Sequence, residues 1–223
     1  GAALHRADMG AWPVPPGEPV LARAGNVLRF TGRRQGCRAL IGFAGGIAVP
    51  PALGSRSTCL AAGFGGAAGR PLQAGDRLAL HERPAQRPAW RQAGAHAHGG
   101  ALRVVLGPQD DHFLAEEVRA FLDSAYELRE DSDRTGCRLR GRRLAHRGPA
   151  EIVTDGMLPG CIQVPPDGVP IVMGPDGPTT GGYPKIAAVI AADVPRLGQL
   201  APGDAVRFRA VTPEEAVRAL EVP

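Results

Sequence analysis

The sequence predicts a mainly β fold with many turns and few helices, and two observations lead to it. Glycine and proline, 31 and 22 of the 223 residues, together approach a quarter of the chain, yet apolar residues still make up 43%. The apolar residues are sufficient for a core, and Gly and Pro often interrupt the apolar runs. This pattern is typical of short strands joined by tight turns. In addition, a turn of Ala or Pro, Gly, and Asn or Asp precedes an alternating stretch three times, at 24–29, 74–79 and 202–207. Repeated turn–strand units favour hairpins or meanders over a helical repeat.

Helices are expected at three places only. One begins at Asp110 or Asp111 and carries an apolar face that includes Phe113, Leu114, Val118, Phe121 and Leu122. A short one follows Asp193. The third begins at Thr212, where Pro213 and Glu215 form a capping-box pattern. Further strands are predicted at Arg38–Phe43, Leu102–Leu106, Glu151–Thr154, Ile162–Val164, Val169–Met173 and Ile186–Ile190.

The stretch from Glu82 to Gly100 lacks periodicity and is interpreted as a linker. It divides the chain into a first subdomain over 1–81, a linker over 82–100 and a second subdomain over 101–223. His96 and His98 fall in this linker without a neighbouring carboxylate or cysteine, so no metal site is predicted.

Charge and composition exclude several classes of function. The net charge is +4 and the pI is near 9.2, but the arginines are scattered and aromatic residues make up only 4%, so no nucleic acid is expected as a partner. No signal peptide is evident, and the longest uncharged stretch, 39–55, contains two prolines, so no membrane span is expected. The four cysteines show no C-x-x-C spacing. A soluble, cytoplasmic protein is the prediction.

The segment 159–186, PGCIQVPPDGVPIVMGPDGPTTGGYPKI, holds the strongest functional signal. Lys185 is the only lysine of the chain, and all the other residues among the 26 Lys and Arg are arginines. Before it, Thr179, Thr180, Gly181, Gly182 and Tyr183 offer hydroxyls and unconstrained backbone N–H groups, which suit an oxyanion or an amide. Gln163 sits in an apolar strand, where its carboxamide needs a buried partner.

Three other places carry candidate residues. Gln109 and Asp111 lie between a strand and a helix, where Asp can cap the helix but two carboxylates with a glutamine exceed what capping requires. Arg134 either pairs locally with Asp133 or faces a substrate anion, and Arg56 either lies in a solvated turn or binds carboxylate or phosphate. No nucleophile elbow, H-E-x-x-H or Walker A loop is present. Catalysis by this chain would therefore depend on a carboxylate or on the lysine, or be shared with a partner.

Several stretches occur in a fixed order along the chain: AGGIAVPPALGSRSTCLAAGFGGAAGRPLQAGDRL, LGPQDDHF, DSDRTGCRL, PGCIQVPPDGVPIV and TTGGYPKIAAVIAADVPRLGQLAPGD. Together they resemble the biotin-dependent carboxyltransferase family, whose members include allophanate hydrolase subunit two, the carboxyltransferase part of urea carboxylase and the C subunit of bacterial 5-oxoprolinase. The TVQD-type start of the family is absent, so the chain is expected to lack the N-terminal part of a full member. The resemblance implies a cyclophilin-like β-barrel in two related subdomains, without implying prolyl isomerase activity.

The resemblance also implies a role for each candidate. Lys185, Tyr183 and Asp111 become candidate catalytic residues, with Asp111 as a base. Gln163, Thr179, Thr180, Gly181, Gly182 and Gln109 become candidates for binding a planar amide or urea group, and Arg56 and Arg134 for binding an anion. The implied function is that of a subunit of an ATP-dependent 5-oxoprolinase, an amide hydrolase that converts 5-oxoproline to glutamate. The alternatives are transfer of a carboxyl group from biotin to urea and a non-catalytic subunit that antagonises a kinase inhibitor.

Cofactors and partners follow from the same resemblance. ATP would be a co-substrate used together with the A and B subunits of oxoprolinase, which are KipI-like and LamB/YcsF-like proteins. Biotin would have to arrive on another chain, because Lys185 follows Pro184 and lacks the Met-Lys-Met context of a biotin acceptor. The ligand would be a small-molecule amide.

Overall fold

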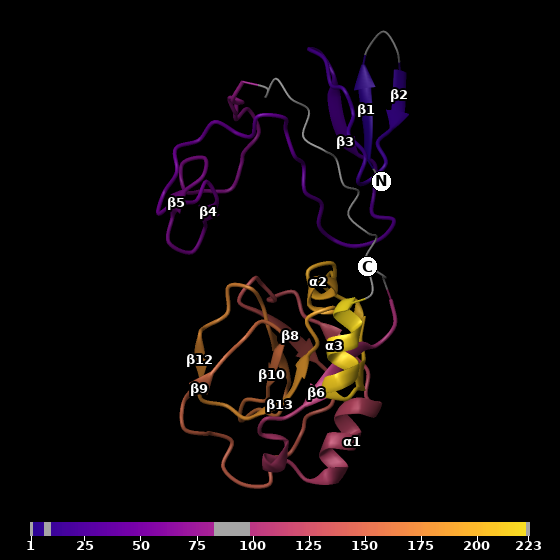
Figure 1. Cartoon of the computed structure of the whole chain (residues 1–223), viewed down its shortest axis with the longest axis vertical. Helices are drawn as coiled ribbons and strands as arrows, with labels where there is room; N and C mark the ends of the chain where they lie inside the picture. The colour runs from indigo at the N-terminus through magenta and orange to yellow at the C-terminus, as the bar shows by residue number, and fades with distance from the viewer. Residues whose placement is uncertain (1, 7–9, 83–98, 222–223) are drawn as a thin grey trace. The chain divides into compact units, whose positions relative to one another are not determined.

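The computed structural model describes residues 2–6, 10–82 and 99–221 (Figure 1). The chain divides into two compact units, one made of Gly1–Arg38 with Gln92–Pro223 and the other of Ala39–Arg91. These units do not follow the predicted boundary at residue 81, because residues 1–38 group with the C-terminal part. The assignment of 1–81 and 101–223 to two family subdomains stays a prediction.

The larger unit is built on one eight-stranded sheet in the order β14-β7-β8-β11-β10-β13-β6-β15. All neighbouring pairs are antiparallel except β15 with β6, which is parallel. The strands are β6 (Leu102–Leu106), β7 (Tyr126–Leu128), β8 (Gly136–Arg140), β10 (Cys161–Gln163), β11 (Ile171–Met173), β13 (Lys185–Val189), β14 (Ala205–Val206) and β15 (Phe208–Ala210).

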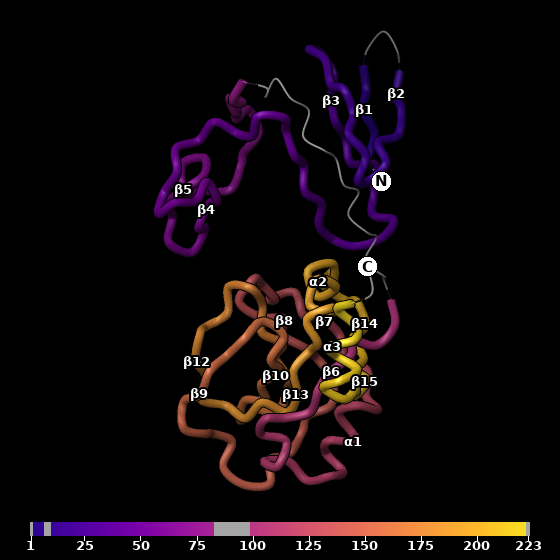
Figure 2. Tube along the Cα trace, in the orientation of Figure 1, coloured from indigo at the N-terminus to yellow at the C-terminus, as the bar shows by residue number. Residues whose placement is uncertain are grey.

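The two outermost strands of this sheet belong to one continuous stretch of chain. Only Arg207 separates β14 from β15, and its carbonyl accepts a hydrogen bond of 2.8 Å from the N–H of Leu102. The chain thus leaves the β7 end of the sheet and joins the β6 end within a single residue, as the adjacent labels in Figure 2 show. The sheet is therefore a nearly closed barrel, and the predicted mainly β barrel is confirmed.

Aromatic side chains form one cluster in the core of the larger unit. Phe208 is 3% exposed and its ring lies 4.7 Å from that of Phe121 on the helix α1 (Ala115–Asp123), with Tyr126 6.0 Å away. Apart from Phe113, the remaining core consists of aliphatic side chains from all parts of the sheet, which include Leu102, Val104, Leu128, Leu139, Ile162, Val164, Val172, Ile186 and Val206.

The three predicted helices are present. The first is divided into a 3-10 turn, η1 (Asp110–His112), and α1, because Phe113 and Leu114 adopt extended backbone angles between them. The short α2 is Val194–Leu197. The third, α3 (Pro213–Glu221), begins with the expected capping box: the Thr212 N–H donates to Glu215 at 2.9 Å and the Glu215 N–H donates to Thr212 Oγ1 at 3.2 Å. No helix in the described residues is long and apolar enough to cross a membrane.

Three small sheets complete the described structure. In the larger unit β1 (Ala2–Arg6) lies between β2 (Gly10–Pro13) and β3 (Val27–Phe30), and a two-stranded ribbon joins β9 (Asp155–Gly156) to β12 (Thr180–Gly181). In Figure 1 this ribbon and the helices α1 and α3 lie at opposite sides of the barrel. The smaller unit contains β4 (Thr58–Cys59) paired with β5 (Phe64–Gly65).

Three predicted strands are wrong. The stretch 38–43 forms no strand, because no segment within 2–6, 10–82 and 99–221 pairs with it and the backbone turns at Gly45 and Gly46, which have φ of 90° and 78°. At 151–154 pairing with the opposite segment begins with a bond from the Ile152 N–H to the Gly182 carbonyl, and the strand itself starts at Asp155. The turn unit at 74–79 also leads to no strand, only to a single bridge between Leu80 and Ile47. Most of the predicted linker, with His96 and His98, lies outside the described residues.

The Phe208→Ala substitution tests the aromatic cluster. Removing the buried ring leaves a cavity beside Phe121 and Tyr126, and we expect the free energy of unfolding to fall by about 3 kcal/mol. Urea denaturation measures this loss. Val217→Ala on α3 is the control, because Val217 is 59% exposed, and its effect should stay within about 0.5 kcal/mol. A Phe208 variant as stable as the control would contradict the central place of the ring.

Candidate functional site

A β-bulge between β10 and β13 places Gln163 opposite Lys185. Along this strand pair Ile162 faces Ala187, whereas the next residue, Gln163, faces Lys185, so Ile186 is the extra residue. Simple alternation would put Lys185 on the same face as Ala187 and Val189, both of which belong to the core. The bulge gives that position to Ile186 and turns Lys185 to the other face, beside Gln163.

The β9–β12 ribbon lies over this face of the barrel. Asp155 pairs with Gly181 and Gly156 with Thr180, and a further bond runs from the Met157 N–H to the Thr179 carbonyl. The Met157 side chain forms a small apolar cluster with Cys161 and Met173 of the barrel. The ribbon therefore packs on the strands that carry Gln163 and Lys185.

The ammonium group of Lys185 joins the barrel to the ribbon. Its Nζ donates to Asp155 Oδ2 at 2.6 Å and to the Gly156 carbonyl at 3.1 Å, and the side chain is only 2% exposed. Asp155 is half exposed. The Lys185 ammonium, together with the Gly156 N–H and the Gln109 carboxamide, lowers the pKa of Asp155 to about 2. At neutral pH the pair is therefore a carboxylate that holds a buried cation in place.

Gln109 is bound at both ends of its carboxamide. Its Oε1 accepts the Lys185 N–H at 3.2 Å, and its Nε2 donates to Asp155 Oδ2 at 3.1 Å. The Gln109 N–H also donates to the Lys185 carbonyl at 3.1 Å. These bonds satisfy the backbone of Lys185 beside the bulge and orient its carboxylate partner, so Gln109 acts as a positioning residue.

Gln163 differs from Gln109 because most of the hydrogen-bonding groups of its carboxamide have no partner in the described residues. The side chain is 6% exposed, and its Nε2 donates one long bond of 3.5 Å to the Tyr183 carbonyl. Within the described part of the chain, Oε1 has no hydrogen-bond partner. A Cβ added to Gly181 would lie 2.3 Å from Gln163 Nε2, so this amide occupies the space that a side chain at Gly181 would fill.

The structure thus brings together Lys185, Gln109, Gln163, Gly181 and Thr180 from the predicted set. Tyr183 contributes its carbonyl, and its ring is 37% exposed. Thr179 and Gly182 take part through their carbonyls, which accept bonds from the opposite segment of the ribbon.

Two predicted residues of the larger unit lie outside this cluster. Asp111 is exposed on η1 and forms no hydrogen bond or ion pair with the cluster in the described residues. Arg134 forms a bidentate pair with Asp176, with distances of 2.5 and 2.8 Å, and both side chains are more than half exposed. The local alternative, a pair with Asp133, is not formed, because Asp133 accepts the N–H groups of Thr135 and Gly136.

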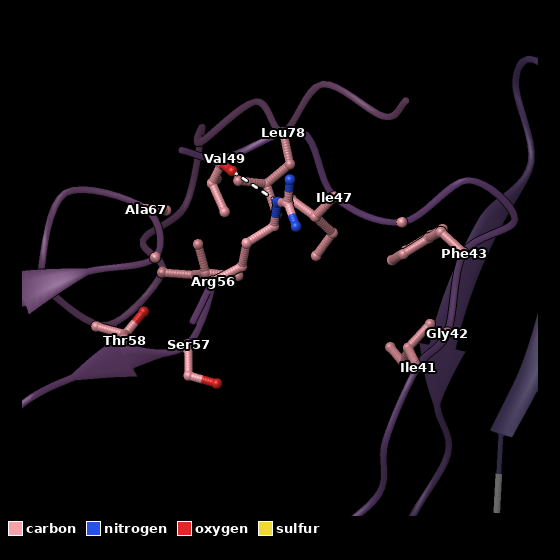
Figure 3. A pocket seen from close by; sticks show the side chains of 13 residues that line it. Ile41, Gly42, Phe43, Ile47, Val49, Arg56, Ser57, Thr58, Ala67 and Leu78 are labelled. Atoms are coloured by element: carbon pink, nitrogen blue, oxygen red, sulfur yellow. Dashed lines mark hydrogen bonds between the residues drawn. The ribbon is translucent and has the colours of Figure 1, made fainter. Parts of the chain in front are cut away.

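Arg56 belongs to the smaller unit, where it lines an open cleft of about 480 Å³ (Figure 3). Its Nε donates to the Val49 carbonyl at 3.0 Å. The cleft walls are mostly apolar and include Ile41, Phe43, Ile47, Leu72 and Leu78. Within 39–82 no side chain larger than hydrogen is buried, since Gly69 is the only buried residue there.

Sequence reasoning missed Asp155. It lies in a Thr-Asp-Gly stretch that predicts a turn, and nothing in its local pattern connects it with Lys185, which is 30 residues away. The only usable signal was indirect: a single buried lysine requires a carboxylate partner.

The pH dependence of stability tests the Asp155–Lys185 pair. The pKa of Asp155 is about 2 in the folded protein against an ordinary value of 3.8, so the carboxylate stabilises the fold above about pH 4. This contribution disappears as the pH falls through about 2. Asp155→Asn should therefore lower the urea midpoint at pH 7, and its deficit against wild type should shrink toward pH 2.5.

The matched control for that experiment is the Lys185→Met background. There Asp155→Asn should have little effect at either pH, because the cation that it neutralises is absent. An equal deficit in both backgrounds would show that Asp155 does not act through Lys185.

Gly181→Ala and Gly182→Ala form a matched pair that tests the contact with Gln163. At Gly181 a methyl group must displace the Gln163 amide or the ribbon, and we expect a loss of about 1–3 kcal/mol in the free energy of unfolding. At Gly182 the nearest atom, the Ile152 carbonyl oxygen, is 3.7 Å away, so alanine should fit. Equal stability of both variants, measured by urea denaturation, would contradict the described packing.

Comparison with known proteins places the chain in a family. The family model described as "Carboxyltransferase domain, subdomain A and B" matches residues 1–210. The chain is 39% identical over 199 residues to a protein of Escherichia coli (strain K12) named as the C subunit of 5-oxoprolinase, and the match covers 88% of this chain and 64% of that protein. A protein of the same name from Haemophilus influenzae is 35% identical over 212 residues, covering 88% of this chain and 63% of its own length.

A solved structure agrees with these relatives. The crystal structure of the Kluyveromyces lactis urea carboxylase superposes with a TM-score of 0.84 at 27% identity, covering 99% of this chain and 21% of that one. The present chain spans less than two thirds of the length of the curated relatives described above. The matched model over most of the sequence, the identity to both relatives and the shared fold show that the chain belongs to the carboxyltransferase-domain family.

Proposed function

We propose that this chain is part of a subunit of an ATP-dependent 5-oxoprolinase, in which the Lys185 cluster acts on the lactam of 5-oxoproline. The observation that carries the proposal is a buried ammonium group and a largely unpaired carboxamide on directly opposed residues, Lys185 and Gln163. A fixed cation beside an amide-reading group suits a reaction at an amide carbonyl. The identity to two proteins named as the C subunit of 5-oxoprolinase supports the same reaction.

Opening the lactam requires charge stabilisation at one atom. Water attacks the lactam carbonyl carbon, a C–O bond forms, the ring C–N bond breaks and the nitrogen takes up a proton, which yields glutamate. Negative charge develops on the carbonyl oxygen during the attack. Lys185 would stabilise this charge, and Asp155, ionised at neutral pH, keeps the lysine in position rather than serving as an acid.

The remaining roles extend beyond this cluster. Asp111 stays our candidate for the base, because it lies two residues from Gln109 on exposed η1. Tyr183 and the Thr179–Gly182 segment would border the amide group of the substrate. Arg56 and Arg134 are candidates for binding an anion. ATP would drive the reaction as co-substrate, together with the A and B subunits of oxoprolinase in the cytoplasm, and the activity would be shared among the subunits.

A second candidate function is carboxyl transfer from biotin to urea. It is favoured by one observation, the superposition of 99% of this chain on the Kluyveromyces lactis urea carboxylase. Biotin would have to come from another chain. The higher identities to the two 5-oxoprolinase relatives favour the first function.

The test uses the full-length protein produced together with the A and B subunits. ATP-dependent release of glutamate from 5-oxoproline should occur with the wild type and fall by about a hundredfold with Lys185→Met, because one oxyanion-stabilising group is lost. Arg140→Ala is the control: Arg140 is an exposed residue paired with Glu127, and its loss should leave the rate unchanged.

Two outcomes would overturn the proposal. Full activity of Lys185→Met would remove the lysine from the reaction. Absence of activity with 5-oxoproline would exclude the oxoprolinase function, and the same complex supplied with biotinylated carrier and urea would then test carboxyl transfer. Inactivity with both substrates would favour a non-catalytic subunit that antagonises a kinase inhibitor.

A further inference from the structure

Two glutamine carboxamides meet at the Lys185 cluster, and only one of them has a free edge. Gln109 uses both its oxygen and its nitrogen, on the Lys185 N–H and on Asp155. Gln163 uses one N–H, in the long bond to the Tyr183 carbonyl. One further N–H and the oxygen of Gln163 remain without a partner in the described residues.

The free edge of Gln163 remains accessible although the side chain is largely buried. Gln163 is 6% exposed, and none of its side-chain atoms is among the fully buried polar atoms without a partner in the described residues, so the unpaired oxygen keeps its contact with solvent. The bulge turns Gln163 toward the ribbon, and Gly181 leaves room for its amide because it has no side chain. Two features of the fold thus fix the position of this amide. A group held in this way, yet unpaired, fits a ligand that brings the missing donor and acceptor.

The free edge defines the chemistry of that ligand. A primary carboxamide can accept through its oxygen and donate through its nitrogen along one edge. Its complement is an amide whose own N–H and C=O point to the same side. The five-membered ring of a lactam enforces this cis arrangement, whereas an open-chain secondary amide is trans and directs the two groups to opposite sides.

We propose that the Gln163 carboxamide recognises the cis-amide edge of a lactam, donating from Nε2 to the ring carbonyl and accepting the ring N–H at Oε1. The inference rests on the proposed function, since it assigns the substrate contact of the same site. Lys185 faces Gln163 across the strand pair, and its ammonium is held on the ribbon by Asp155 and the Gly156 carbonyl, so both side chains lie on the face of the barrel that the ribbon covers.

This pairing also accounts for two substrates in one family. Urea presents an N–H and a C=O on the same side, as a lactam does. The relatives include two proteins named for 5-oxoprolinase and a structure of a urea carboxylase. A carboxamide that binds only this shared edge would suit either substrate.

The experiment compares 5-oxoproline with its isosteric lactone, 5-oxotetrahydrofuran-2-carboxylate, in which a ring oxygen replaces the N–H. The full-length complex with the A and B subunits is used, and inhibition constants for the lactone are set against the affinity for 5-oxoproline. We expect the wild type to prefer the lactam by about tenfold or more, because the lactone leaves Oε1 unpaired. Gln163→Ala should abolish this preference, because the alanine side chain has no oxygen that could accept the ring N–H.

Gln163→Glu separates recognition from a structural role. The carboxylate still accepts the ring N–H but no longer donates to the carbonyl, so lactam affinity should fall by about tenfold or more while the preference over the lactone persists. Gln73→Ala, at an exposed glutamine of the smaller unit, is the control and should match the wild type in both measurements.

The outcomes distinguish this inference from the proposed function. If the wild type releases glutamate from 5-oxoproline and Gln163→Ala keeps the lactam preference, the assignment of Gln163 is overturned and the oxoprolinase function stands. If the wild type releases no glutamate, the oxoprolinase function is overturned. In that case a binding preference for 2-pyrrolidone over γ-butyrolactone that Gln163→Ala removes supports the cis-amide edge, and equal binding of the two overturns it.

Discussion

The bulge at Ile186 is the constraint on which the rest of the site depends. A regular strand from Lys185 to Val189 would place the lysine on the face that carries Ala187 and Val189 in the barrel core, where an ammonium group would lack water and a counter-charge. One extra residue turns the lysine to the other face, while its neighbour Ile186 and Ile162 on the partner strand stay buried. The same shift sets Gln163 opposite Lys185, so a single register change creates the cluster.

Burial of the lysine then determines what must surround it. A buried cation without a partner is strongly destabilising, and the ribbon supplies Asp155 and the Gly156 carbonyl. Gln109 supplies the acceptor for the Lys185 N–H and at the same time orients Asp155. The ribbon, the barrel and the segment before η1 are therefore tied together at one side chain, which explains why a two-residue strand pair is sufficient to define the ribbon.

Sequence patterns predicted what depends on neighbours along the chain. The capping box at Thr212 and Glu215 and the strand at Leu102–Leu106 rest on local spacing, and the structure has both. The isolation of Lys185 and the apolar setting of Gln163 were also visible. The bulge and Asp155 were not, because register depends on the pairing of distant strands and an Asp-Gly pair predicts a turn wherever it occurs. For the same reason the predicted strand at 38–43 failed, since alternation alone does not provide a partner strand.

A contact with the amide edge that lactams and urea share cannot discriminate between these two kinds of substrate. Selectivity must therefore depend on a different contact. The feature that 5-oxoproline has and urea lacks is a carboxylate, which requires a cation. Lys185 of the cluster is already bound to Asp155 and Gly156, and Arg134, which lies outside the cluster, is held in a bidentate pair by Asp176. If both pairs persist, the proposed binding of 5-oxoproline requires a cation from outside these two residues. Selectivity between the two proposed substrates would then be set separately from recognition of the amide edge by Gln163.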